Sequence, residues 1–274
     1  MLPQVKVISD DYIINIYKKY KPQYKLDLTL PFGQSSFKNI NSAYSKKIFL
    51  ARETGKATAP PLITFNNKTF DFNQLNDIFP IIEDEIFMRH RTMVLIIDKD
   101  IEMVHVELLK QQLATSGYIS IAYMVTDDNS KSYFKSYDRA YIGRKLPFAH
   151  PRGLPKPSKA IADSSTIGNL VKIELPGDGT TKVEGALVQM RNLPETLARL
   201  YLKNPKGTLF WMDISENASY GNYIFVQNCL DRFISNIREK KSHKNYGLTV
   251  QELPSAKKYG LLRRYPLKIH ETYY

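Results

Sequence analysis

Cysteine is almost absent from this sequence, since Cys229 is the only one among 274 residues. A single cysteine cannot form a disulfide within the chain, and it cannot supply the thiolates of a cysteine-rich zinc site. Cys229 falls in an expected helix with no histidine close to it in the sequence, so we interpret it as a packed core residue. The sequence therefore favours a reducing compartment.

Long apolar runs are also missing. No stretch approaches the roughly 20 apolar residues that a membrane helix needs, so we expect no membrane partner. The first residues, MLPQVKVISDD, contain no apolar segment typical of a secretory signal. Apolar residues nevertheless make up 43% of the chain, enough for a folded core.

The usual catalytic motifs are missing as well. Gly177 and Gly179 lie in a turn without the lysine of a phosphate-binding loop. His105 and Glu107 have the spacing of a deaminase motif, but the paired cysteines of that site are absent. We find no serine nucleophile elbow and no dinucleotide fingerprint. The sequence predicts no catalytic residue, no metal site and no cofactor.

One pair of carboxylates keeps an enzymatic alternative open. Asp98 and Asp100 follow an apolar strand, and Glu83 or Glu85 could complete the metal-binding set of a nuclease. Both aspartates have ordinary explanations, however. Asp100 is placed to cap a helix and Asp98 to end a strand. We therefore expect a non-enzymatic protein, with a metal-dependent nuclease as the alternative.

Positive charge is the most informative feature that is present. Lysine and arginine number 39 against 27 acidic residues, which gives a net charge of +12. An AT-rich coding sequence would enrich lysine without any binding function. Clustering of the cations instead indicates a polyanion partner, because closely spaced cations gain the most binding free energy by displacing counterions from the phosphates of a nucleic acid.

The first cluster spans residues 131–160, which are basic, aromatic and rich in proline. Eight cations between 131 and 159 face one acid, Asp138. Cations can neutralise phosphates and rings can stack on unpaired bases; the alternative is that the rings are core residues and the cations are merely solvated. The candidate nucleic-acid-binding residues here are Lys135, Arg139, Tyr141, Arg144, Lys145, Phe148, Arg152, Lys156 and Lys159.

The second cluster lies near the C-terminus. Ten cations between 232 and 268 face only Glu239 and Glu252. Cations at the end of a helix also complement its dipole, but so many exceed what that requires. The candidates here are Arg238, Lys240, Lys241, Lys244, Lys257, Lys258, Arg263 and Arg264.

Hydrophobic periodicity predicts an α/β or α+β fold with a mixed sheet. A buried strand at 93–97, a helix from a cap at Asp100 to about 116 and a strand at 118–125 form a βαβ unit. Two hairpins are expected, at 62–72 and at 169–190. A long C-terminal helix is expected at 222–240.

Further elements and the domain boundaries follow from the same pattern. The expected elements are a helix at 12–20, irregular chain at 21–60, a helical stretch at 73–87, a helix at 195–203 with Pro194 in its first turn, and a strand at 208–214. Three regions result: an α/β region at 1–130, the basic arm at 131–160, and an α+β region with a basic tail at 161–274. These regions could also form one continuous domain.

The whole chain resembles the DNA end protector, or head completion, proteins of T-even-like tailed bacteriophages. The resemblance lies in size, in basic balance and in segments such as MLPQVKVISDDYIINIYKKYKPQYK and SNIREKKSHKNYG. It implies a virion protein, also present in the host cytoplasm, that binds the ends of packaged double-stranded DNA and contacts phage head or neck proteins. It further implies completion of the head and protection of injected ends from host exonuclease. The resemblance assigns no functional position.

The charge clusters and the resemblance together predict a DNA-binding protein that acts sterically at DNA ends. Three alternatives remain open. The first is a head–tail connector whose basic surface lines a DNA channel, the second is the nuclease that uses Asp98 and Asp100, and the third is an RNA-binding module.

Overall fold

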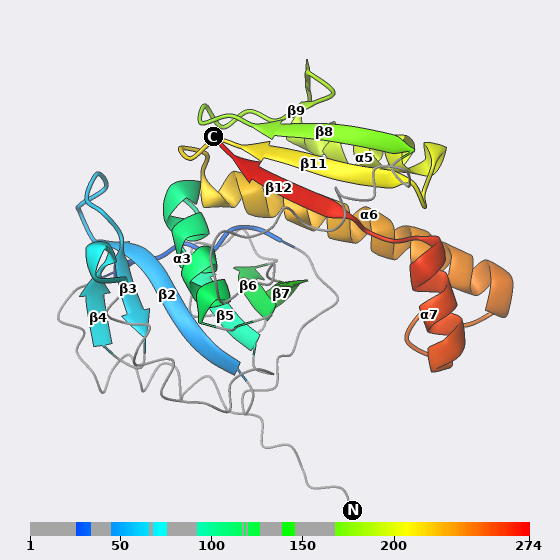
Figure 1. Cartoon of the computed structure of the whole chain (residues 1–274), viewed down its shortest axis with the longest axis horizontal. Coiled ribbons are helices and arrows are strands. Elements are labelled where there is room, and N and C mark those ends of the chain that lie inside the picture. The colour runs from blue at the N-terminus through cyan, green and yellow to red at the C-terminus, as the bar shows by residue number, and fades with distance from the viewer. Residues whose placement is uncertain are drawn as a thin grey trace, which may run out of the picture.

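The computed structural model describes residues 26–33, 45–65, 68–75, 92–116, 118, 120–126, 139–145 and 168–274. Two mixed β-sheets and four α-helices in these residues confirm the predicted α/β or α+β class (Figure 1). None of these helices combines the length and apolar character needed to cross a membrane. The expected helix at 12–20 and most of the expected helical stretch at 73–87 lie outside the described residues.

The elements have the following bounds. The first sheet contains β1 (Leu26–Asp27), β2 (Ser45–Glu53), β3 (Leu62–Phe65), β4 (Lys68–Asp71), β5 (Thr92–Ile97), β6 (Ser120–Thr126) and β7 (Arg139–Lys145). The second contains β8 (Asn169–Leu175), β9 (Lys182–Val183), β10 (Ala186–Leu187), β11 (Thr208–Ile214) and β12 (Ile269–Tyr273). The helices are α3 (Met103–Thr115), α5 (Leu193–Lys203), α6 (Tyr220–Tyr246) and α7 (Ser255–Arg264), with 3₁₀ turns η2 (Phe72–Gln74) and η6 (Met190–Asn192).

The βαβ unit is confirmed. β5 and β6 pair in parallel, and α3 connects them. The predicted cap at Asp100 is wrong, because α3 begins three residues later, after Glu102. The first N–H groups of α3 instead donate to main-chain carbonyls of Ala218 and Glu216 at 2.9 Å. A chain segment distant in sequence thus satisfies the helix terminus, which the local pattern could not indicate.

The first sheet has the order β4-β3-β2-β5-β6-β7, with β1 paired to β2. The hairpin predicted at 62–72 is present as β3 and β4. The prediction of irregular chain at 21–60 is wrong where β2 pairs with β3 on one side and β5 on the other. Ile48 and Leu50 of β2 are fully buried, whereas Lys46 and Lys47 made this segment look like a solvated loop.

Part of the predicted basic arm is also a strand. β7 pairs antiparallel with β6 over its whole length, and Ile142 is fully buried. Residues 139–145 therefore extend the first sheet. The remainder of the region at 131–160 lies outside the described residues.

The second sheet has the order β10-β9-β8-β11-β12, and its three longest strands are parallel. The hairpin predicted at 169–190 is present as β8 and β9, which pair antiparallel. A further short strand, β10, pairs with the other side of β9. The strand at 208–214 and the helix containing Pro194 are confirmed. β12 and α7 were not predicted from the sequence.

The long C-terminal helix is present as α6 and exceeds its predicted bounds at both ends. The hydroxyl of Ser219 caps its start by accepting from the Asn222 N–H at 3.3 Å. Its end is set by Gly247, whose φ of 68° lies in the left-handed region that favours glycine. In Figure 1, α6 runs beneath the second sheet and continues beyond it to α7.

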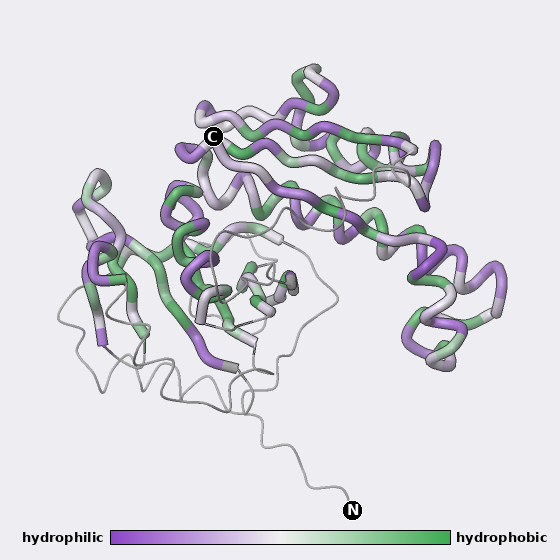
Figure 2. Tube along the Cα trace, in the orientation of Figure 1, coloured by the Kyte–Doolittle hydropathy of each residue, from purple (hydrophilic) through white to green (hydrophobic). Residues whose placement is uncertain are grey.

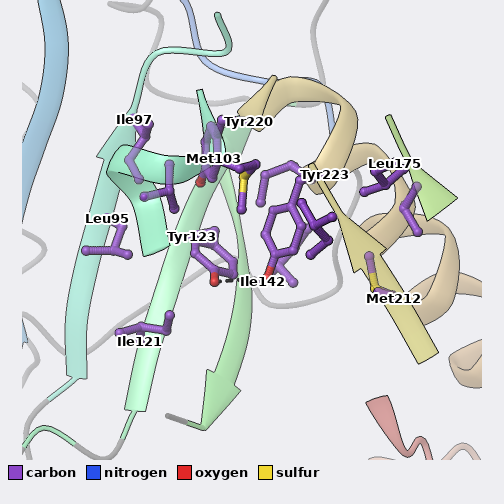
Figure 3. Close-up of a cluster of buried hydrophobic side chains, with 14 of the residues drawn as sticks. Leu95, Ile97, Met103, Ile121, Tyr123, Ile142, Leu175, Met212, Tyr220 and Tyr223 are labelled. Atoms are coloured by element: carbon purple, nitrogen blue, oxygen red, sulfur yellow. Dashed lines mark hydrogen bonds between the residues drawn. The ribbon is translucent and has the colours of Figure 1, made fainter. Parts of the chain in front are cut away.

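One hydrophobic cluster contains side chains from both sheets and from α3, α5 and α6. Figure 3 shows Tyr123 of β6 and Tyr223 of α6 meeting within it, with their hydroxyls 3.1 Å apart. Tyr220 adds a third ring, in edge contact with Tyr123 at 5.9 Å. The two sheets are thus parts of one packed core.

A buried polar network crosses the same boundary. Lys110 of α3 donates to the carboxylate of Glu271 and to the hydroxyl of Tyr273 in β12, both at 2.8 Å. Tyr223 and Gln227 of α6 each donate to the other carboxylate oxygen of Glu271, also at 2.8 Å. Because every member has partners, the network avoids the cost of an unpaired buried charge.

Lys110 and Glu271 each stabilise the charged form of the other. Burial alone lowers the pKa of Lys110, but the nearby carboxylate of Glu271 reverses this and the net pKa is raised. Burial alone raises the pKa of Glu271, but Lys110 and the donated hydrogen bonds lower it overall. Both groups therefore stay charged at neutral pH, because each lies beside an opposite charge.

We predict that Lys110→Met lowers the free energy of unfolding by about 3–5 kcal/mol, because it leaves Glu271 charged and buried without its cation. Urea denaturation measures this. Lys56→Met is the control: Lys56 is 60% exposed and pairs with Glu53, so its loss should cost no more than about 1 kcal/mol. Equal effects of the two substitutions would contradict the role of the buried pair.

Candidate nucleic-acid interface

The structure separates the predicted binding residues into three groups. The first group lies outside the described residues and consists of Lys135, Phe148, Arg152, Lys156 and Lys159. The second group lies in β7 and consists of Arg139, Tyr141, Arg144 and Lys145. The third group lies in α6 and α7 and consists of Arg238, Lys240, Lys241, Lys244, Lys257, Lys258, Arg263 and Arg264.

The β7 group includes two residues with structural partners. Tyr141 packs against a small apolar cluster that includes Val94 and Met124. Arg144 donates to the carboxylate of Asp231 at 3.0 and 3.1 Å and to the side-chain oxygen of Gln227 at 2.7 Å. Because these contacts already use its guanidinium to join β7 to α6, we leave Arg144 out of the proposed interface.

The α6–α7 group forms a coherent surface, which we call the basic helical tip (residues 238–264). It contains eight cations and two acids, Glu239 and Glu252. Side chains of Leu253 and Leu261 are buried and pack α7 onto the rest of the chain. The carboxylate of Glu239 accepts from the Val250 N–H at 3.2 Å, and the Ser242 hydroxyl donates to the Leu248 carbonyl at 2.7 Å. The tip is therefore an ordered part of the fold.

The cations of the tip point mainly to solvent. Lys240, Lys244, Lys257, Arg263 and Arg264 are exposed, and Lys241 and Lys258 are half-buried. Arg238 differs, because its guanidinium donates to the Tyr265 carbonyl at 2.7 and 3.0 Å and so holds the chain that leaves α7. Figure 2 shows hydrophilic residues along much of this end of the molecule.

Within the described part of the chain, none of these eight cations forms an ion pair with a carboxylate; the acid Glu239 pairs instead with His243. Elsewhere the structure places cations beside acids, as Lys172 lies between Glu174 and Asp213 at 2.9 and 3.0 Å. The tip therefore concentrates uncompensated positive charge. A polyanion would supply the missing counter-charge.

Two tyrosines lie among these cations, and sequence reasoning did not select them. Lys257 lies 5.1 Å from the ring centre of Tyr246, and Arg263 lies 5.8 Å from that of Tyr259. Tyr259 is 63% exposed and Tyr246 38%. The four-residue spacing of Tyr259 and Arg263 was visible in the sequence, but its meaning depended on a helix that had not been predicted.

The sequence matches no protein-family model and no curated protein. The assignment of this surface therefore rests on its own charge and geometry.

Among the residues of the nuclease alternative, Asp98 has main-chain partners in the structure. One carboxylate oxygen of Asp98 accepts from the Thr29 N–H at 2.6 Å, and the other accepts from the Asp100 N–H at 2.9 Å. Asp98 thereby fixes the end of β5, while the side chain of Asp100 is exposed. Glu83 and Glu85 lie outside the described residues. Groups of three or more potential metal-ligating side chains do not occur in the described ranges.

Cys229 is buried in α6, as predicted. Burial raises the pKa of its thiol to about 12. A thiol with this pKa is protonated at neutral pH and is a poor nucleophile.

We predict that Asp98→Ala lowers the free energy of unfolding by about 1–3 kcal/mol, because two main-chain N–H groups lose their acceptor. Asp100→Ala should change it by no more than about 0.5 kcal/mol. Thermal or urea unfolding measures both, and DNA affinity of the folded variants should match the parent. A folded Asp98→Ala protein that has lost its biological activity would instead favour the nuclease alternative.

Proposed function

We propose that this chain binds double-stranded DNA through the basic helical tip and holds it without cleaving it. The observation that supports the proposal most is the group of exposed cations in α6 and α7 that lacks carboxylate partners in the described structure. Such cations bind phosphates by releasing condensed counterions, and no metal or catalytic group is required.

The proposed mechanism is steric protection of DNA ends. Cations of the tip hold the terminal phosphates, and the body of the protein covers the end so that an exonuclease finds no free terminus. The resemblance to phage DNA end protector proteins supports this choice among DNA-binding functions. From the same resemblance we propose that the protein is present in the virion and in the infected host cytoplasm, with head or neck proteins as further partners.

We predict strongly salt-dependent DNA binding. If the protein contacts about 6–10 phosphates, its affinity should fall by about 10³–10⁵ between about 50 and 200 mM salt.

The combined variant Lys257→Ala, Lys258→Ala, Arg263→Ala, Arg264→Ala should lower the slope of log affinity against log salt by up to about 3.6, because each lost phosphate contact removes about 0.9. Fluorescence anisotropy with a labelled linear duplex measures both quantities.

The matched control neutralises four exposed cations near α5: Arg191, Arg199, Lys203 and Lys206. This variant changes the net charge by the same amount but should keep the parental slope. Equal losses in the two variants would show that overall charge alone governs binding and would contradict the assignment of the tip.

We predict a preference for DNA ends. Closed circular duplex should compete less well than linear duplex of equal length and concentration. Bound protein should also slow digestion of the linear duplex by an exonuclease without slowing an endonuclease at an internal site. Competition by circular DNA as strong as by linear DNA would favour the connector that lines a DNA channel.

A further inference from the structure

Tyr259 is an exposed ring in α7, within the basic helical tip. The opposite side of α7 is fixed by the buried side chain of Leu261. Within the described residues, the only ring contact of Tyr259 is with the guanidinium of Arg263. The ring is therefore not part of the hydrophobic core that holds α7 in place.

The arrangement of this pair suits a nucleotide. Residues four apart share one face of a helix, so the ring and the guanidinium are presented together. A cation over one face of the ring leaves the other face open, consistent with the 63% exposure of Tyr259. A base is a flat aromatic group joined to a phosphate, so it can stack on the open face while nearby cations contact the phosphate.

Tyr246 repeats the combination at the end of α6, with Lys257 over its ring. Its ring is less exposed and closer to the junction of the two helices. Two ring–cation pairs thus occur in one surface that contains eight cations and two acids. Stacking requires a base face that duplex DNA shows only at an end or in an unpaired strand.

We propose that Tyr259, held by Arg263, is a base-stacking site that selects unpaired or terminal nucleotides of DNA. This inference rests on the proposed DNA-binding function and deepens it, because it names the residue that distinguishes an end from the middle of a duplex. The neighbouring cations Lys258 and Arg264 provide the phosphate contacts common to all DNA.

The experiment compares Tyr259→Ala with Tyr274→Ala. Tyr274 is 64% exposed but lies after β12, outside the tip, so it is a control of matched size and exposure. Each variant is titrated with a duplex that bears a short single-stranded overhang and with a dumbbell of the same duplex closed at both ends. 2-Aminopurine in the overhang reports stacking by loss of its fluorescence.

Tyr259→Ala should weaken binding to the overhang duplex by roughly 5- to 150-fold, the effect of losing one stacked base. It should leave dumbbell affinity and its salt slope unchanged and abolish the quenching of 2-aminopurine. Tyr259→Phe should restore both, because stacking needs the ring and not the hydroxyl. Tyr274→Ala should behave as the parent on both substrates.

Two results would overturn the inference while leaving the proposed function intact. In the first, a folded Tyr259→Ala protein still prefers the overhang duplex and still quenches the fluorescence of its 2-aminopurine. In the second, the folded variant loses affinity equally for both DNAs. The latter would make Tyr259 a general support of the surface, or part of a contact with a protein partner. Failure of the parent to bind either DNA at low salt would overturn the proposed function itself.

Discussion

The buried ion pair between Lys110 and Glu271 is the constraint on which the arrangement of the molecule depends. A charge removed from water must be paired and fully hydrogen-bonded, and here the partners come from α3, α6 and β12. The requirement can be met only when the two sheets adopt one relative position. The apolar core around Tyr123 and Tyr223 supplies most of the attraction, and the polar network fixes how the surfaces meet.

The same network sets the direction of α6. Gln227 donates to Glu271 and accepts from Arg144, which also pairs with Asp231 one turn further along. These contacts anchor the first half of α6 between the sheets. An α-helix is stiff over this length, so the anchored half determines where the second half emerges. The basic helical tip is thereby presented to solvent at a defined place, well away from β8 and β11 (Figure 1).

This division of α6 explains why a single helix contains both buried aromatic residues and a cluster of cations. Its early residues, such as Tyr220 and Ile224, are fully buried, whereas Lys240 and Lys244 are exposed. Preorganisation of the exposed half would lower the entropic cost of the proposed DNA binding. A disordered basic tail of equal charge would attract DNA but would not hold Tyr259 and Arg263 in a fixed relation.

Sequence reasoning succeeded where local hydrophobic pattern dominates, as in β5, β11 and the middle of α6. It failed where pairing partners are distant: β2 and β7 contain cations, and only their neighbours in the sheet make them strands. Arg144 is predicted from charge to contact phosphate, and nothing nearby in the sequence reveals its structural partner Asp231, 87 residues away. The cations of α6 and α7 were selected by charge alone, but Tyr259 could not be distinguished from the other 17 tyrosines without knowing which rings the core covers.

We propose that DNA occupies the basic helical tip. Lysine acetylation followed by mass spectrometry, with and without saturating linear duplex at low salt, tests it most directly. DNA bound at the tip should protect Lys240, Lys244 and Lys257 from acetylation while Lys203 and Lys206 react as before. Acetylation of the three tip lysines at an undiminished rate, under conditions in which the DNA is bound, would show that DNA lies elsewhere on the protein.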